Sequence, residues 1–151
     1  MKNFTKVAIA TAAIAVATSA LAQPKPEAFV KHRKAALTLM GWYFGPMGAV
    51  AKGEKPFNKD EMAKSSMLVA TMAKLPFDSF VAGTEAVGNT EALPAVWSNN
   101  AKFKELATKL GTETETLAKL ASAGDEAGFK KQFGVVGGTC KACHDDFRKK
   151  Q

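Results

Sequence analysis

Hydrophobic residues recur every three or four positions along much of the chain, which is the spacing of one face of an α-helix. The first such pattern runs from about residue 27 to residue 44. Gly45-Pro46 is expected to end it, because proline removes a backbone donor and disfavours helix at the residue before it. The face that this pattern defines is formed by Phe29, Arg33, Ala36, Leu37, Met40 and Phe44.

Three further patterns of the same kind predict helices over residues 59–74, 99–122 and 125–147. Asn58 precedes the first of them and Glu61 follows three positions later, an arrangement typical of a capped helix start. Ser98 is expected to cap the helix over 99–122, because a short oxygen-bearing side chain accepts hydrogen bonds from the first free amides of a helix, and Asp125 is expected to open the last helix.

The longest stretch without a helical pattern covers residues 77–94. Phe77 and Phe80 indicate that it packs against the helices, and long ordered loops in compact domains are often functional. Four amphipathic helices joined by two short connections and one long one predict an all-α fold. We expect an antiparallel four-helix bundle with a cofactor site between facing helices.

The last helix carries Cys140-Lys141-Ala142-Cys143-His144, a C-x-x-C-H sequence that is the attachment signature of a c-type haem. Two thiols three positions apart lie on one helix face, where both can form thioethers with the vinyl groups of one porphyrin. His144 then offers a neutral imidazole nitrogen to the iron. Both thiols continue the apolar seam of their helix, which predicts a covalent haem in the bundle core.

Other chemistry for the two cysteines fits the chain less well. A thioredoxin-like C-x-x-C belongs in a strand–helix setting, and no β-rich stretch surrounds this one. A structural zinc site takes four ligands, whereas the chain offers two cysteines and one further histidine, His32, far away in sequence. A haem-free thiol oxidoreductase or metal-binding bundle is the competing interpretation.

Residues 1–22 have the features of a secretory signal peptide. Lys2 and Lys6 form a basic start, an apolar run follows, and Ala20-Leu21-Ala22 is an A-x-A cleavage site. The run is too short to span a membrane, so no membrane insertion of the mature chain is expected. Residues 23–151 then form one domain in the periplasm, where bacteria attach c-type haem.

The formal net charge is +7, and a leader with two lysines and no acid leaves about +5 on the mature domain. This mild excess is ordinary for a soluble protein and gives weak attraction to an acidic partner. Nucleic-acid binding is not expected, because the protein is exported and its basic residues form no clustered stripe.

The chain resembles cytochrome c′, the class II c-type cytochromes, over essentially all of residues 23–151. The likeness rests on the C-x-x-C-H near the C-terminus, with Asp145 and Arg148 after it. It also rests on residues 31–40 and on the sequences Leu75-Pro76-Phe77 and Ala95-Val96-Trp97-Ser98. Ordinary class I cytochromes c attach haem near the start of the chain and supply a methionine from near its end.

The resemblance implies roles for residues of the last helix. Cys140 and Cys143 would form the thioethers of one haem c, and His144 would be the proximal ligand of the iron. Arg148 would lie near the proximal face.

Three other charged residues match family positions near the haem. Arg33 would pair with a haem propionate, the natural partner of a buried guanidinium, with a surface salt bridge as the alternative. Lys34 and Glu91 would approach the haem edge, and for both a solvated charge is the competing interpretation.

The sixth coordination position of the iron distinguishes two functions. Leu37 matches the apolar residue that lies over the open iron in cytochromes c′, where small gases such as nitric oxide and carbon monoxide bind. Met40, one turn away on the same face, is the alternative, because related low-spin class II cytochromes use a first-helix methionine as ligand. His32 falls about 140° round the helix from Leu37 and is expected at the surface.

The resemblance therefore implies a gas-binding and electron-carrying haem protein with an unidentified redox partner. No acid–base pair accompanies the predicted haem site, so we do not expect an enzyme. The family often forms homodimers through the first two helices. Candidate interface residues are Trp42, Met67 and Leu68.

Overall fold

The computed structural model describes residues 24–150, so the predicted leader, residues 1–22, lies outside the described part. Regular structure in the described part is helical. The helices are α1 Pro26–Ala51, α2 Lys59–Met72, the 3-10 helix η1 Phe77–Ser79, α3 Ala95–Ser98, α4 Asn100–Ala123 and α5 Glu126–Phe147. No helix between residues 24 and 150 combines the length and apolar character needed to cross a membrane.

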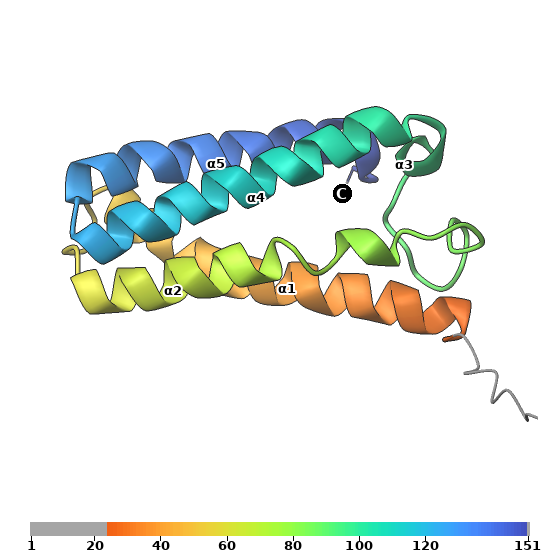
Figure 1. Cartoon of the computed structure of the whole chain (residues 1–151), viewed down its shortest axis with the longest axis horizontal. Coiled ribbons are helices and arrows are strands. Elements are labelled where there is room, and N and C mark those ends of the chain that lie inside the picture. The colour runs from red at the N-terminus through yellow and green to blue at the C-terminus, as the bar shows by residue number, and fades with distance from the viewer. Residues whose placement is uncertain (1–23, 151) are drawn as a thin grey trace, which may run out of the picture.

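The long helices α1, α2, α4 and α5 form an antiparallel bundle (Figure 1). α2 packs against α4, α4 against α5, and α1 against both α2 and α5. The predicted antiparallel four-helix bundle is confirmed. Figure 1 also shows that the C-terminus, the start of α1 and the long connection between α2 and α4 lie at one end of the bundle.

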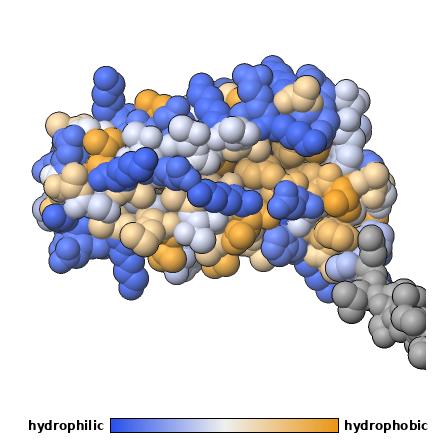
Figure 2. Space-filling model, in the orientation of Figure 1, coloured by the Kyte–Doolittle hydropathy of each residue, from blue (hydrophilic) through white to orange (hydrophobic). Residues whose placement is uncertain are grey.

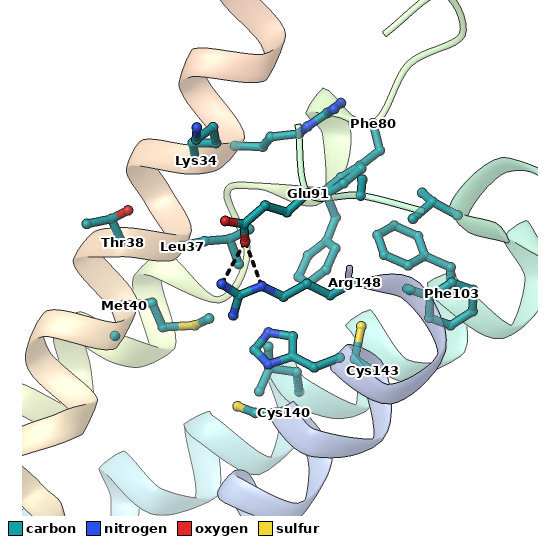
Figure 3. A pocket seen from close by; sticks show the side chains of 18 of the residues that line it. Lys34, Leu37, Thr38, Met40, Phe80, Glu91, Phe103, Cys140, Cys143 and Arg148 are labelled. Atoms are coloured by element: carbon teal, nitrogen blue, oxygen red, sulfur yellow. Dashed lines mark hydrogen bonds and ion pairs between the residues drawn. The ribbon is translucent and has the colours of Figure 1, made fainter. Parts of the chain in front are cut away.

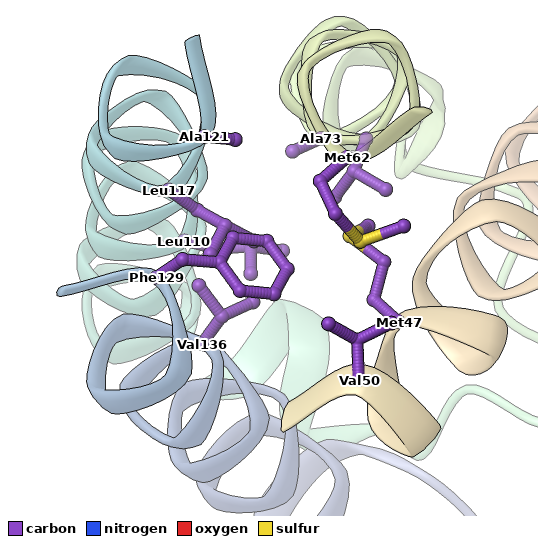
Figure 4. Packing of buried hydrophobic residues seen from close by; sticks show 10 residues of the cluster. Met47, Val50, Met62, Ala73, Leu110, Leu117, Ala121, Phe129 and Val136 are labelled. Atoms are coloured by element: carbon purple, nitrogen blue, oxygen red, sulfur yellow. The ribbon is translucent and has the colours of Figure 1, made fainter. Parts of the chain in front are cut away.

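The hydrophobic core consists of two clusters. The larger one fills the space between the four long helices and includes Met47, Leu117 and Phe129, each with none of its surface exposed (Figure 4). The smaller one, built on Val96, Phe103 and Phe147, joins the long connection to α4 and α5. The predicted haem site lies between these clusters.

The prediction that Gly45-Pro46 ends the first helix is wrong, because α1 continues through Pro46 to Ala51. The extra turns bury Met47 fully and leave Val50 4% exposed, both in the larger cluster. Burying two such side chains stabilises by about 1.5–3 kcal/mol each, which offsets a cost of about 3 kcal/mol for a proline inside a helix. Tertiary packing therefore overrides the local stop signal.

The predicted helix caps are partly confirmed. Asn58 accepts a hydrogen bond from the amide of Glu61 at 3.1 Å, and Asp125 accepts one from the amide of Gly128 at 2.9 Å. Ser98 is not a cap, because it is the last residue of α3, and α4 begins after Asn99. Burial of Val96, which is 1% exposed, holds this separate helical turn against the bundle.

The proline inside α1 gives a testable prediction. Pro46→Ala supplies the amide that can donate to the carbonyl four residues back, and we expect the free energy of unfolding to rise by about 1–2 kcal/mol. The gain is less than the full helical penalty of proline, because alanine raises the conformational entropy of the unfolded chain and so stabilises the unfolded state. Pro26→Ala is the control, since proline at a helix start sacrifices no intrahelical bond. Denaturant unfolding of the holoprotein that shows no greater gain at position 46 than at position 26 contradicts this account.

Candidate functional site

The C-x-x-C-H sequence lies on the last turns of α5, and the spacing of its neighbours explains its orientation. Val136, Cys140, Cys143 and Phe147 follow one another at steps of four, three and four, so they share the inner face of the helix. Val136 and Phe147 are buried, and both thiols are half-buried between them. Cys140 packs against the larger core cluster and Cys143 against the smaller one.

A cavity of about 500 Å³ opens in front of these thiols. α1 forms one wall, α5 forms another, and the connection between α2 and α4 closes the end of the bundle (Figure 3). Its volume lies in the range usual for cofactor pockets. Every predicted site residue lines this one cavity: Arg33, Lys34, Leu37, Glu91, Cys140, Cys143, His144 and Arg148.

The environment of the thiols disfavours redox chemistry. Burial raises the pKa of Cys140, and burial together with the nearby Cys140 and Asp146 raises the pKa of Cys143 to about 11. Both groups are therefore protonated near neutral pH, whereas disulfide exchange and metal binding need the thiolate. Among residues 24–150, no group of histidine, cysteine and carboxylate side chains is arranged to hold a bare metal ion. Two neutral thiols on one apolar wall fit a covalently attached porphyrin.

His144 follows directly after the thiols and lines the same cavity. Partial burial and the positive charge of Arg148 lower its pKa, while Asp145 and Glu91 oppose them. The net shift favours the neutral form of the imidazole. A neutral imidazole has the free nitrogen lone pair that an iron ligand needs.

The wall that faces α5 carries both candidates for the distal side. Leu37 and Met40 extend from α1 into the cavity, towards the space that Cys140 and Cys143 border (Figure 3). Both side chains are half-buried. His32 is exposed on α1, and its Nδ1 lies 2.7 Å from the hydroxyl of Ser79, outside the cavity lining.

Arg33 is buried, with 2% of its surface exposed, and its guanidinium holds the connection between α2 and α4. One terminal nitrogen donates to the carbonyl of Ser79 at 3.1 Å and to the hydroxyl of Thr84 at 2.8 Å. The other donates to the carbonyl of Thr84 at 3.1 Å and to the hydroxyl of Thr90 at 2.9 Å. These four bonds use all but one of its five N–H donors. These bonds leave the Nε–H donor uncommitted.

Aromatic rings complete the surroundings of this guanidinium. The Cζ atom of Arg33 lies 4.5 Å from the centroid of the Phe80 ring and 5.6 Å from that of the Trp97 ring, and both distances are within cation–π range. Burial lowers the pKa of Arg33, and the charge of Glu85 opposes the shift. An arginine stays charged under such shifts. The cavity wall therefore contains a buried positive charge with its own set of partners.

The other predicted charges lie at the cavity mouth. The amine of Lys34 donates to the carbonyl of Asn89 at 3.1 Å. Arg148 donates from Nε at 2.8 Å and from Nη2 at 2.6 Å to one carboxylate oxygen of Glu91 (Figure 3). These contacts tie the connection to α1 on one side and to the end of α5 on the other.

The backbone strengthens the second tie. Ala92 and Arg148 form an antiparallel bridge. The amide of Leu93 donates to the carbonyl of Phe147 at 2.9 Å, and the amide of Lys149 donates to the carbonyl of Glu91 at 2.8 Å. The residues just past the C-x-x-C-H sequence are thus paired with the segment that Arg33 holds.

Several residues of the site were not predicted from the sequence. Thr84 and Thr90 are buried hydroxyls that accept from Arg33, and they follow no helical or strand period. Phe80 and Phe103 line the cavity. One sequence signal could have found them. Arg33 was predicted on the inner face of its helix, so it needs hydrogen-bond acceptors, and residues 77–94 form the one long irregular stretch that could supply them.

Comparison with known proteins places the chain among haem proteins. The family model described as cytochrome c′ matches residues 28–148. The chain is similar to cytochrome c′ of Rubrivivax gelatinosus, with 40% identity over 126 residues, which cover 83% of this chain and 98% of that protein. The crystal structure of that cytochrome c′ superimposes with a TM-score of 0.80 over 83% of this chain and 98% of the other.

A second solved structure shows a related protein with a ligand. It is a nitric oxide complex of a variant of cytochrome c prime from Alcaligenes xylosoxidans. This structure superimposes with a TM-score of 0.78 at 38% identity and covers 84% of this chain and 98% of the other. The chain therefore belongs to the cytochrome c′ family, and its cofactor is a covalently bound haem c.

Proposed function

We propose that the mature chain, residues 23–151, is a periplasmic cytochrome that binds small neutral gases such as nitric oxide and carbon monoxide and carries single electrons. When bound, the haem supplies an iron that takes up one electron and one gas molecule. The observation that carries the proposal is the cavity itself. Cys140, Cys143 and His144 line it from α5, and the hydrocarbon side chain of Leu37 lines it from α1.

Each residue of α5 has a defined part in this proposal. Each thiol would hold the haem by adding its sulfur and its proton across one vinyl double bond, which gives a thioether without an external oxidant. Burial keeps both thiols protonated and so suits this addition better than disulfide formation. His144 serves as proximal ligand through its neutral imidazole, with Arg148 beside it on the same side.

On the distal side, Leu37 offers carbon and hydrogen only. A leucine cannot donate to or accept from a ligand, so charged and strongly polar ligands lose hydration without compensation. Small neutral gases lose little, but they compete for space with the side chain. Crowding by Leu37 thus selects for size and for the absence of charge.

Met40 supports a second candidate function. It lines the same cavity from the same helix, and its thioether is a known haem ligand. With Met40 on the iron, the protein would be a low-spin, six-coordinate electron carrier without gas binding.

We propose a carrier and gas binder rather than an enzyme. Among the described residues that line the cavity, His144 is the one imidazole, and the proximal position claims it. Peroxide cleavage relies on a second acid–base group on the distal side. Besides Leu37 and Met40, α1 lines the cavity with Arg33, Lys34 and Thr38, and none of these is an imidazole or a carboxylate. Arg33, with four donors committed to the connection, positions the cavity wall and reserves Nε–H for a propionate.

A homodimer formed through α1 and α2 is part of the proposal. Trp42 of α1 is 73% exposed and Met67 of α2 is 60% exposed, whereas Leu68 is half-buried. Exposed large apolar groups on two adjacent helices are typical of an association surface. Lys34 and Arg148 at the cavity mouth, together with the net positive charge, favour an acidic redox partner.

Covalent attachment gives the first prediction of this proposal. In the Cys140→Ala/Cys143→Ala double variant, acidified organic solvent is expected to extract all of the haem, because no sulfur remains to bind it. The wild type and a Val135→Ala control on the same helix should retain it, as measured by a pyridine haemochrome assay of the protein fraction. A wild type without covalent haem would refute both cytochrome functions.

The open distal side gives the second prediction. The reduced wild type should show a broad high-spin spectrum that changes when carbon monoxide is added. Leu37→Ala relieves crowding and is expected to tighten carbon monoxide binding about tenfold, or about 1.4 kcal/mol. Leu39→Ala, at a leucine 45% exposed on the same helix, is the matched control and should leave the affinity unchanged. Equal affinities in the two variants would argue against Leu37 as the distal group.

The methionine alternative gives the third prediction. Met40→Leu is expected to leave the spectra of the oxidised and reduced protein unchanged, because Leu37 rather than Met40 faces the iron. A sharp low-spin α band in the wild type that ignores carbon monoxide and disappears in Met40→Leu would establish the six-coordinate electron carrier instead.

A further inference from the structure

A second cavity of about 420 Å³ lies beside the haem cavity, between the end of α2, η1 and the first half of α4. Small residues line it, namely Ala73 after α2 and Ala107 and Gly111 on α4. Lys74, Asp78 and Lys104 also belong to its lining. Figure 2 shows hydrophobic side chains gathered in the hollow between α4 and the chain that follows α2. We call this space the outer cavity.

Three phenylalanines line both cavities. Phe77, Phe80 and Phe103 belong to the lining of the haem cavity and also to that of the outer cavity. The ring of Phe103 packs edge-to-face against Phe77 at 5.7 Å and against Phe80 at 4.9 Å between centroids. The two cavities are therefore separated by a wall of packed rings, which we call the aromatic wall.

The parts of the wall differ in their support. Phe103 is 4% exposed and sits on the long helix α4, whereas Phe77 opens the short helix η1 and Phe80 follows it. Passage of a two-atom molecule between the cavities requires the rings of Phe77 and Phe80 to move aside while Phe103 stays in place.

We propose that the outer cavity is a docking site for small neutral gas molecules, from which they cross the aromatic wall into the haem cavity. The inference rests on the proposed gas-binding function and names the route to the site. Polar and charged solutes are excluded because the wall has no hydrogen-bonding group to replace water. A neutral diatomic gas has no such requirement.

Gly111 provides a way to fill the outer cavity without disturbing the bundle. A Cβ atom built at this helical glycine meets nothing within 4 Å. Gly111→Leu therefore places a side chain in open space and also removes a residue that weakens a helix. Gly134→Leu is the matched control, because Gly134 lies on α5, lines neither cavity and also has nothing within 4 Å of an added Cβ.

Xenon tests the docking site, with alanine methyl NMR of the holoprotein as the readout. Xenon should shift the methyl resonances of Ala73 and Ala107 in the wild type and in Gly134→Leu, and the shifts should vanish in Gly111→Leu. Absence of xenon shifts at Ala73 and Ala107 in the wild type overturns the inference. Shifts that persist in Gly111→Leu overturn it as well.

Carbon monoxide kinetics test the route. Gly111→Leu is expected to slow both the association of carbon monoxide with the reduced holoprotein and its dissociation about fivefold. This factor corresponds to a rise of about 1 kcal/mol in the barrier of the route, which both rates share. The affinity then stays unchanged, because a route alters rates but not the end states. Gly134→Leu should match the wild type.

The outcomes separate the route from the function. Carbon monoxide binding with wild-type rates in Gly111→Leu overturns the route and leaves the proposed function intact. A reduced wild type that binds no carbon monoxide overturns the proposed function, and the xenon shifts alone then decide whether the outer cavity takes small apolar molecules.

Discussion

The buried charge of Arg33 is the constraint on which the arrangement around the site depends. A guanidinium that is 2% exposed is tolerated only when its donors are satisfied, because an unpaired buried charge costs several kcal/mol. Its partners, the carbonyl of Ser79 and both polar oxygens of Thr84 among them, all lie in the one long irregular connection. Satisfying the charge therefore fixes the segment that closes the end of the cavity.

The fixed connection lets an apolar cavity exist at the end of a bundle. Phe77 and Phe80 come from this segment and meet Phe103 of α4, so the wall joins two distant parts of the sequence. Burial in this environment raises the pKa of both thiols, and partial desolvation together with the charge of Arg148 lowers the pKa of His144. The cavity that holds the thiols is therefore lined largely by apolar side chains.

Sequence reasoning succeeded where the signal is local. Apolar periodicity predicted the four long helices, and Asn58 and Asp125 predicted where α2 and α5 start. The spacing of the two cysteines predicted that both thiols share the inner face of α5. It failed at Pro46, where burial of distant partners outweighs a local stop signal, and at Ser98, where packing of Val96 creates a separate turn.

The surroundings of the predicted charges lay beyond local signals. Lys34, Glu91 and Arg148 meet at one cavity mouth because the backbone of residues 91–93 runs beside that of residues 147–149. Thr84 and Thr90 became partners of Arg33 through a loop path that no period encodes. The residue types at the site were therefore predictable, whereas their mutual contacts depended on the fold.

The pairing of the C-terminal tail with the long connection has a consequence for how the bundle frays. Helix ends and chain termini normally open first and most often. Here the end of α5, the start of α1 and the long connection gather at one end of the molecule, yet the Ala92–Arg148 bridge and the Arg33 bonds link them. Unwinding of the turn that bears Cys143 and His144 must break the pairing of residues 147–149 with residues 91–93. The end of the bundle that would otherwise be the loosest is thereby protected, and it is the end that holds the cofactor.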